Sequence, residues 1–330
     1  MRKIFKVLVA MALSMCLLLG CSSPTDVSKE NITIKIGSLK GPTSMGLLYL
    51  MPDIASDYGE LKGRENYSFE MFTTADEILP KMMSGDLDIA LIPANVASVL
   101  YNKSQGAILV IDINTLGVLY CVSDDLSITT VSDLKGKTIY VTNKGTTPDY
   151  TIRYLLAAAG ISEDEVNIEY KSEALEVAAT LAKESGSVGV LPQPFATACC
   201  IQNENLHDVL DLTGEWEKVA AEDSKLLTGV TVVRKEFLEQ NPKAVEQFLK
   251  DHKTATDFAT ENIEAAAELT VKTGIIEKAP LAAKALPKCN IVCITGKDMK
   301  ETLEGYLSVL YDMEPTSVGG SLPDSDFYYE

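Results

Sequence analysis

The sequence predicts an α/β protein of two lobes, in which each lobe is a mainly parallel sheet flanked by helices. Short apolar or alternating runs take turns with helix-period segments along the chain, which is the pattern of strands joined by crossover helices. The 330 residues, 46% of them apolar, are enough for two medium-sized domains. The formal net charge of −18 argues against nucleic acid and anionic membrane surfaces as partners, because both attract basic faces.

The N-terminus predicts a signal peptide that ends in a lipidation site. Three basic residues come first: Arg2, Lys3 and Lys6. An apolar run over residues 7–19 follows, and Gly20 stands directly before Cys21. The run is too short to span a bilayer, and a small residue before a cysteine is what lipoprotein processing requires. We expect residues 1–20 to be removed, Cys21 to carry the lipid and residues 21–30 to form a polar tether; a plain secretion signal or a short membrane anchor is the alternative.

The first part of the chain contains four runs that predict strands. They are residues 32–36, 67–71, 87–92 and 107–113. The first two alternate between apolar and polar positions, and the last two are continuous apolar runs typical of buried strands. Thr74 and Glu77 fit a capping box, whose hydroxyl and carboxylate satisfy the first free amides of a helix over residues 76–83.

A second α/β block begins near Gly117. Residues 138–142 predict a strand, after which Thr147 suits a helix N-cap and Pro148 the first helical position. Apolar residues then recur at helical spacing until Gly160 ends the helix. A further helix and strand follow at residues 175–182 and 188–191.

The third region begins with a predicted strand over residues 229–233. A helix follows from Pro242, and His252 lies on its apolar face, so we interpret this histidine as a packing residue. A last long helix includes residues 303–310, and the polar segment after it up to Glu330 predicts a surface tail.

The cysteines do not form a metal-binding pattern. Five lie beyond the lipidation site: Cys121, Cys199, Cys200, Cys289 and Cys293. The last two are spaced for a local bridge, but their spacing is not that of a known metal pair, and His207 and His252 are the only imidazoles. We expect no metal site, no cofactor and mostly small buried thiols.

Several loops that follow predicted strands share glycines, hydroxyls and amides. Open sheets bind ligands beyond the carboxyl ends of their strands, where these loops and helix N-termini converge. Backbone amides at helix starts suit a small polar or anionic molecule, although ordinary helix capping explains any one loop by itself. The candidate ligand-binding residues are Lys40, Gly41, Pro42, Thr43, Ser44, Met45, Thr73, Thr74, Pro93, Ala94, Asn95 and Thr115 in the first block, and Lys144, Gly145, Thr146, Thr147, Gln193 and Pro194 in the second.

Four segments, in order, resemble the solute-binding proteins of ABC importers. The similar group includes the nitrate, sulfonate, taurine and thiamine-pyrimidine binders. The segments are residues 85–93 (GDLDIALIP), 133–139 (DLKGKTI), 191–195 (LPQPF) and 229–242 (GVTVVRKEFLEQNP), within a similarity that covers about residues 31–310.

The resemblance implies a type II periplasmic-binding-protein fold whose two lobes close over a solute like a hinge. Lobe 1 would comprise residues 31–116 and 231–330, lobe 2 would comprise residues 117–230, and the crossings would fall near residues 115–119 and 227–232. It further implies an extracytoplasmic monomer that reaches the membrane only through its lipid and delivers its solute to an ABC permease.

Departures from the family pattern bear on the solute. Gln193 stands where relatives often have an acidic or aromatic residue, so a cationic ligand loses a counter-ion. The proposed loops contain no arginine, which favours a flat polar heterocycle, of vitamin or pyrimidine type, over an inorganic anion. A sensory lipoprotein and a pyrimidine-forming enzyme of the same fold are the alternatives. We expect no catalytic residues, because the loops contain no nucleophile with a base beside it.

Overall fold

The structure, a computed structural model, describes residues 32–59, 64–222 and 224–330. The predicted signal peptide, Cys21 and the tether lie outside the described residues. No helix within the described ranges has the length and apolar character needed to cross a membrane. Residues 34–330 form one compact unit.

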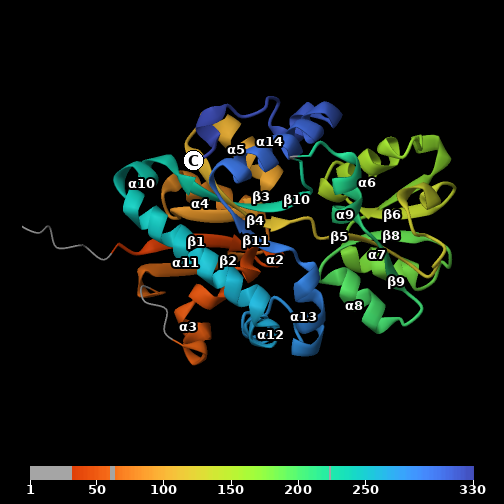
Figure 1. Cartoon of the computed structure of the whole chain (residues 1–330), viewed down its shortest axis with the longest axis horizontal. Helices are drawn as coiled ribbons and strands as arrows, with labels where there is room; N and C mark the ends of the chain where they lie inside the picture. The colour runs from red at the N-terminus through yellow and green to blue at the C-terminus, as the bar shows by residue number, and fades with distance from the viewer. Residues whose placement is uncertain (1–31, 60–63, 223) are drawn as a thin grey trace, which may run out of the picture. The chain divides into compact units, whose positions relative to one another are not determined.

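The strands form two sheets. The six-stranded sheet has the order β11-β4-β10-β3-β1-β2, and the five-stranded sheet has the order β7-β6-β8-β5-β9 (Figure 1). The strands of the first sheet are β1 (Ile34–Leu39), β2 (Tyr67–Phe72), β3 (Ile89–Pro93), β4 (Ile108–Leu116), β10 (Leu227–Arg234) and β11 (Ile291–Ile294). Those of the second are β5 (Leu119–Ser123), β6 (Thr138–Thr142), β7 (Asn167–Lys171), β8 (Val188–Pro192) and β9 (His207–Asp211).

The predicted two-lobed α/β class is confirmed, and both sheets are mixed. β1 is parallel to β2 and β3, and β6 is parallel to β7 and β8. β10 and β5, the strands that enter a sheet from the other one, run antiparallel to their neighbours. The chain leaves each sheet at the carboxyl ends of its parallel strands and enters the other sheet at the same end. The entering strand must then run in the opposite direction, which is why β5 and β10 are antiparallel to their neighbours.

The helices lie between and beside the strands. Their bounds are α2 (Pro42–Met45), α3 (Pro52–Ala55), α4 (Ala75–Ser84), α5 (Ala94–Ser104), α6 (Thr147–Ala158), α7 (Ala174–Leu181), α8 (Phe195–Gln202), α9 (Leu212–Val219), α10 (Lys235–Gln240), α11 (Pro242–Glu261), α12 (Ile263–Lys272), α13 (Ala279–Ala285) and α14 (Gly296–Met313). The capping box of Thr74 and Glu77 on α4 is confirmed. The N-cap of α6 is Thr146, one residue before the predicted Thr147, because the helix already begins at Thr147.

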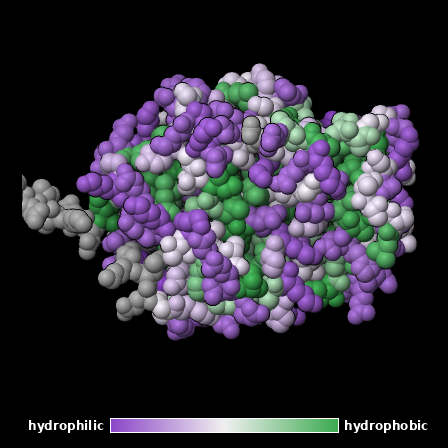
Figure 2. Space-filling view, in the orientation of Figure 1, coloured by the Kyte–Doolittle hydropathy of each residue, from purple (hydrophilic) through white to green (hydrophobic). Residues whose placement is uncertain are grey.

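The long helix α11 shows how an amphipathic pattern covers the six-stranded sheet. Its buried positions include Val245, Phe248, His252 and Ala255, which recur at helical spacing. In Figure 1 α11 crosses the near side of the sheet, and Figure 2 shows its outward side as mainly hydrophilic. The helix therefore turns one apolar stripe, with the histidine in it, toward the strands.

Helix α14 connects the apolar cores of the two sheets. Its buried Leu303, Tyr306 and Leu307 belong to one hydrophobic cluster that also contains Val110 of β4 and Ile139 of β6. The ring of Tyr306 lies 5.8 Å from that of Trp216 on α9. The two sheets are thus held together by shared apolar burial as well as by the chain crossings.

The prediction of a surface tail at the C-terminus is wrong. Phe327 is fully buried and Tyr328 is 6% exposed, and Tyr328 forms an isolated bridge with Val110. The Tyr101 hydroxyl donates to the Asp324 carboxylate at 2.5 Å. The polar composition hid the segment's two anchoring aromatic rings, whose apolar area favours docking.

The five cysteines of the described chain are free thiols. The local bridge considered between Cys289 and Cys293 is not formed. Cys289 is buried, its thiol donates to the Ala285 carbonyl at 3.3 Å, and burial raises its pKa to about 12. This thiol behaves as a small packing residue.

Candidate functional site

The strand tips of the six-stranded sheet meet around Gly229. This residue pairs with Pro93 of β3 on one side and Thr115 of β4 on the other. A Cβ atom at Gly229 would lie 2.4 Å from Cγ2 of Thr43 and 2.5 Å from Oδ1 of Asn114. The absence of a side chain therefore allows three of the predicted loops, those of Thr43, Pro93 and Thr115, to converge.

The hydroxyls of the loop over residues 40–45 are already used within the protein. Oγ1 of Thr43 donates to the Leu39 carbonyl at 3.1 Å, and Oγ of Ser44 contacts Oγ of Ser38 at 2.8 Å. Ser44 and Met45 are buried, whereas Lys40 is exposed. These groups shape the loop more than they offer free donors.

The N-terminus of α5 offers uncapped backbone amides on this side of the site. The helix begins at Ala94 directly after the tip of β3, and no side chain of the described residues caps it. Its first turn carries no acid, so the partial positive charge of the helix end is not offset there. The side chain of Asn95 turns away, because its amide donates to the Ser317 carbonyl at 3.3 Å.

Gln193 lies at the tip of β8, beside the first crossing between the sheets. Its backbone amide donates to the Val118 carbonyl at 2.8 Å, and the Thr197 hydroxyl donates to its side-chain oxygen at 2.7 Å. The residue is 2% exposed, yet its side-chain nitrogen has no hydrogen-bond partner among the described residues. A buried amide without a partner costs roughly 1–3 kcal/mol, which favours an acceptor that completes it.

The loop over residues 144–147 already binds an anion of its own chain. The Gly145 amide donates to the Asp149 carboxylate at 2.8 Å, and the Tyr170 hydroxyl donates to the same carboxylate at 2.7 Å. Burial, followed by this hydrogen bond, raises the pKa of Tyr170 to about 12. Lys144 is exposed with its ammonium 5.8 Å from the Tyr170 ring. An external anion would be repelled by Asp149 here.

Thr73 and Thr74 lie apart from the convergence point. They follow β2, the edge strand of the sheet, and are exposed. Their backbone amides donate to the Glu77 carboxylate at 3.1 and 2.9 Å, and these bonds lower the pKa of Glu77. At this loop the function is helix capping.

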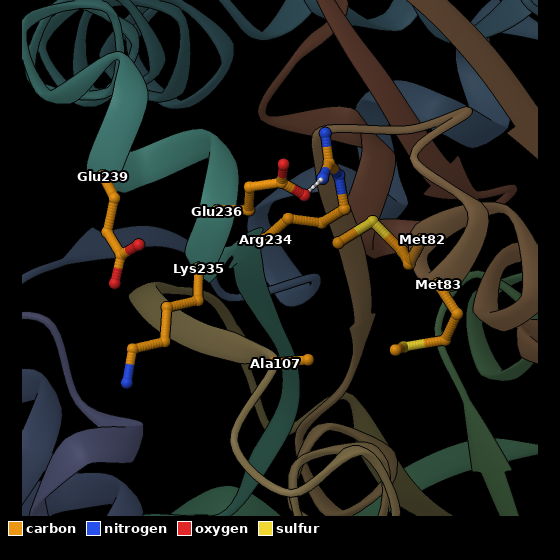
Figure 3. A pocket seen from close by; sticks show the side chains of 7 residues that line it. All are labelled: Met82, Met83, Ala107, Arg234, Lys235, Glu236 and Glu239. Atoms are coloured by element: carbon orange, nitrogen blue, oxygen red, sulfur yellow. Dashed lines mark hydrogen bonds and ion pairs between the residues drawn. The ribbon is translucent and has the colours of Figure 1, made fainter.

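Two surface pockets of the described residues lie away from the predicted loops. The pocket in Figure 3 is lined by Met82, Met83, Ala107, Arg234, Lys235, Glu236 and Glu239. It opens where β10 ends and β4 begins, at the end of the sheet opposite the converging loops. Arg234 forms an ion pair there with Glu236 at 3.3 Å (Figure 3). The second pocket is lined by Glu246, Leu249, Lys250, Lys253, Cys293 and Thr295.

The chain segment before β11 contacts the crossing and was missed by the sequence analysis. The Tyr120 hydroxyl of β5 donates to the Lys288 carbonyl at 3.4 Å, and Lys288 forms an ion pair with Asp208 of β9. Helix α13 lies next to α8 in the same region (Figure 1). No pattern in the sequence indicates these contacts, since their partners are about 80 or more residues apart.

A buried acid and histidine form a second polar feature inside the six-stranded lobe. His252 is buried, and its ring lies 5.4 Å from that of Phe248, as a packing residue requires. Its Nδ1 also lies 3.1 Å from a carboxylate oxygen of Asp112, and Cys293 is close to both. No spacing or motif in the sequence connects these three residues.

Relatives and solved structures that cover most of the chain were found. A relative from Brucella abortus (strain 2308), named only as a binding protein, is 24% identical over 314 residues, 92% of each chain. An ABC transporter structure from Parabacteroides distasonis has a TM-score of 0.74 at 22% identity, over 90% of this chain and 99% of that one. The aliphatic sulphonate binding protein SsuA of Escherichia coli has a TM-score of 0.69 at 16% identity, over 90% of this chain and 92% of that one. At these identities the solved structures show the fold.

The family follows from a profile that covers most of the chain. The profile described as "ABC transporter, phosphonate, periplasmic substrate-binding protein" matches residues 60–270. This span contains both crossings between the sheets and most of the converging loops. The chain therefore belongs to the phosphonate family of periplasmic substrate-binding proteins of ABC transporters.

Proposed function

We propose that the protein is a lipid-anchored, extracytoplasmic solute-binding protein that captures a small polar or anionic molecule and delivers it to an ABC permease. The lobes would be residues 31–116 with 231–330, and residues 117–230. The observation that carries the proposal is the buried, unpartnered amide of Gln193 beside the crossing. Cys21 would carry the lipid, and the protein would act as a monomer without a cofactor.

The hydrogen-bond donors that have no partner within the described residues indicate the chemistry of the solute. The Gln193 amide and the uncapped N-terminus of α5 both donate, and neither carries a full charge. They suit an acceptor oxygen or ring nitrogen, as in a sulfonate, a phosphonate or a heterocyclic vitamin precursor. Asp149 disfavours a second anionic group near residues 144–147.

Solute entry requires the lobes to separate. The side chains at the strand tips of the two sheets are covered by other parts of the protein, since Thr43, Ser44, Thr115 and Gln193 are all buried. A hinge motion at the two crossings would expose these residues, and closure would then exclude water from the bound solute.

Burial of the thiol beside His252 supports a binding role over an enzymatic one. Cys293 is close to His252 and Asp112, as a nucleophile with its base would be. In the absence of a bound metal ion, burial and the charge of Asp112 raise the pKa of Cys293, which keeps the thiol protonated and a weak nucleophile.

A thermal-shift screen of the purified protein tests the proposal. The panel contains alkylsulfonates, alkylphosphonates and the hydroxymethyl pyrimidine of thiamine. We expect one class to raise Tm, and Gln193→Leu to weaken its binding about tenfold, the equivalent of one lost hydrogen bond. Gln202→Leu, an exposed position at the end of α8, serves as the matched control and should bind as the parent does.

Two outcomes would contradict the proposal: no compound raises Tm, or Gln193→Leu binds the stabilising compound unchanged. Stimulation of the cognate permease's ATPase by the loaded protein separates transport from sensing. Loss of metabolic palmitate labelling in Cys21→Ala tests the anchor.

A further inference from the structure

Three metal-ligating side chains meet inside the six-stranded lobe. Asp112 comes from β4, His252 from α11 and Cys293 from β11. A carboxylate oxygen, a ring nitrogen and the sulfur, one from each, lie within 4.8 Å of one another. The side chains of Asp112 and His252 are 0% exposed. An imidazole, a carboxylate and a thiol are the three side-chain types that zinc prefers.

The hydrogen bonds around these residues leave two polar groups unsatisfied. Nδ1 of His252 faces Oδ2 of Asp112 at 3.1 Å, and the Thr231 hydroxyl donates to the other oxygen of Asp112 at 2.8 Å. With Nδ1 as the donor, Nε2 of His252 is a bare acceptor. Nε2 and Oγ1 of Thr256 are both buried and have no partner within the described chain. Both border Gly46, at 3.5 and 3.1 Å from the position a Cβ would take.

A metal ion between the three residues would resolve this arrangement. Two ligands at about 2.0 Å from a tetrahedral ion are about 3.3 Å apart, close to the observed distance between Nδ1 and Oδ2. With Nδ1 bound to the ion, the ring proton moves to Nε2, on the side where Oγ1 of Thr256 lies. The Thr231 hydroxyl then orients the ligating carboxylate from the second shell.

Cys293 is placed to complete the site and to connect it with the surface. It lines the pocket that also contains Lys253 and Thr295, so an ion and a fourth, water ligand can reach it from solvent. The pairing of β11 with β4 shifts register between Ile291 and Ile294, and this irregular strand can bring the sulfur to ligand distance. The ammonium of Lys253 is paired with both carboxylate oxygens of Asp257, at 2.5 and 2.7 Å, which offsets its repulsion of a cation.

We propose that Asp112, His252 and Cys293 bind one divalent transition-metal ion of zinc's class. The donor set excludes calcium and magnesium as preferred occupants, because these ions select oxygen ligands. The ion would tie β11 and α11 to β4 and so stabilise the six-stranded lobe. The three ligands adjoin the converging loops through Thr231, which bonds both Asp112 and Asn114, but none of them is among the residues proposed to bind the solute. Binding of the ion can therefore be tested in the absence of solute.

Metal titration of the chelator-stripped protein tests this proposal. We expect one equivalent of Zn²⁺ to bind and to raise Tm, and Co²⁺ to produce a thiolate-to-cobalt charge-transfer band. Cys293→Ser should abolish the band, and His252→Asn should lower the affinity for Zn²⁺ at least tenfold. Cys200→Ser and His207→Asn are matched controls outside the cluster, one partly buried and one exposed, and should keep both signals.

The apo proteins provide the check on folding. Tm values of parent and Cys293→Ser in chelator should agree within a few degrees, because a thiol and a hydroxyl differ little in size. The proposal is overturned if stripped parent binds no Zn²⁺ equivalent, if the cobalt spectrum lacks the thiolate band, or if Cys293→Ser and Cys200→Ser bind alike. Weak binding of several metal equivalents in every variant also overturns the proposal, since such binding would come from surface carboxylates.

Discussion

The side-chain amide of Asn290 donates a hydrogen bond to the carbonyl of Gly117 at 2.6 Å. The Asn290 carbonyl in turn accepts from the amide of Leu116 at 3.0 Å. Asn290 has φ of 46°, in the left-handed region that asparagine tolerates better than other residues with a side chain. This residue therefore fastens the segment before β11 to the first crossing between the sheets.

Asn290→Ala should lower the free energy of unfolding by about 1–3 kcal/mol, since it removes the hydrogen bond and places alanine in a left-handed conformation. Asn290→Gly loses the same hydrogen bond but keeps the backbone conformation, so its free energy of unfolding should fall less. Urea denaturation of the parent and the two variants measures these free energies. An alanine variant as stable as the glycine variant would contradict the role of the backbone conformation.

Gly229→Ala should destabilise the protein by about 1–3 kcal/mol, because its Cβ would lie 2.4 Å from Thr43 and force the converging loops apart. Solute binding should fall with it. Gly214→Ala is the control: the nearest atom to its added Cβ would be 3.8 Å away, and alanine favours the helix α9. Adding Thr43→Ser, which removes the closest methyl group, should restore part of the loss. Thermal unfolding and solute titration of the four proteins measure both effects.

Phe327→Ala should cost about 3–5 kcal/mol of unfolding free energy, because the ring is fully buried next to Tyr101 and Tyr328. Leu322→Ala, in the same segment but 42% exposed, should change stability little. Equal effects in chemical denaturation would mean that the C-terminal segment is the surface tail that its composition predicts.

Asp125 should contribute stability that disappears in acid. The hydrogen bond from Lys137, followed by those from Ser127, lowers its pKa to about 2 in the folded protein. An unfolded aspartate titrates near 3.9, so between these values the unfolded state binds the proton more readily and stability falls as the pH falls. Asp125→Asn should be less stable than the parent above pH of about 4, and the difference should shrink toward pH 2. Denaturation curves across this range measure it, and a constant difference would refute the assignment.

Local patterns predicted seven of the eleven described strands and five of the thirteen described helices. β6 occupies residues 138–142 as expected, the capping box of Thr74 and Glu77 starts α4, and apolar residues at helical spacing gave α6 and α11. These features depend on residues within a few positions of each other, and such interactions do not need the rest of the protein. The short strands β5, β7, β9 and β11 were missed. β7 (NIEYK) and β9 (HDVLD) are mainly polar, and the apolar β5 (LYCVS) and β11 (IVCI) are too short for periodicity alone to identify.

The candidate site was predicted in part. The loops of Thr43, Pro93 and Thr115 follow strands that lie side by side, and they meet at Gly229. The sequence indicated that Glu77 caps the helix after β2, as it does. It could not show that Asp149 already occupies the loop after β6, because a free helix end and one capped by an acid share the same apolar spacing.

The sequence by itself determined the two-lobed α/β class, and its N-terminus predicts export and lipidation signals. The tertiary structure alone decided that Asp112, His252 and Cys293 lie together and that Phe327 is buried. Each of these contacts joins segments at least 40 residues apart in the chain. Their proximity is set by how β4, β11 and α11 pack, and no periodicity within a single segment encodes that packing.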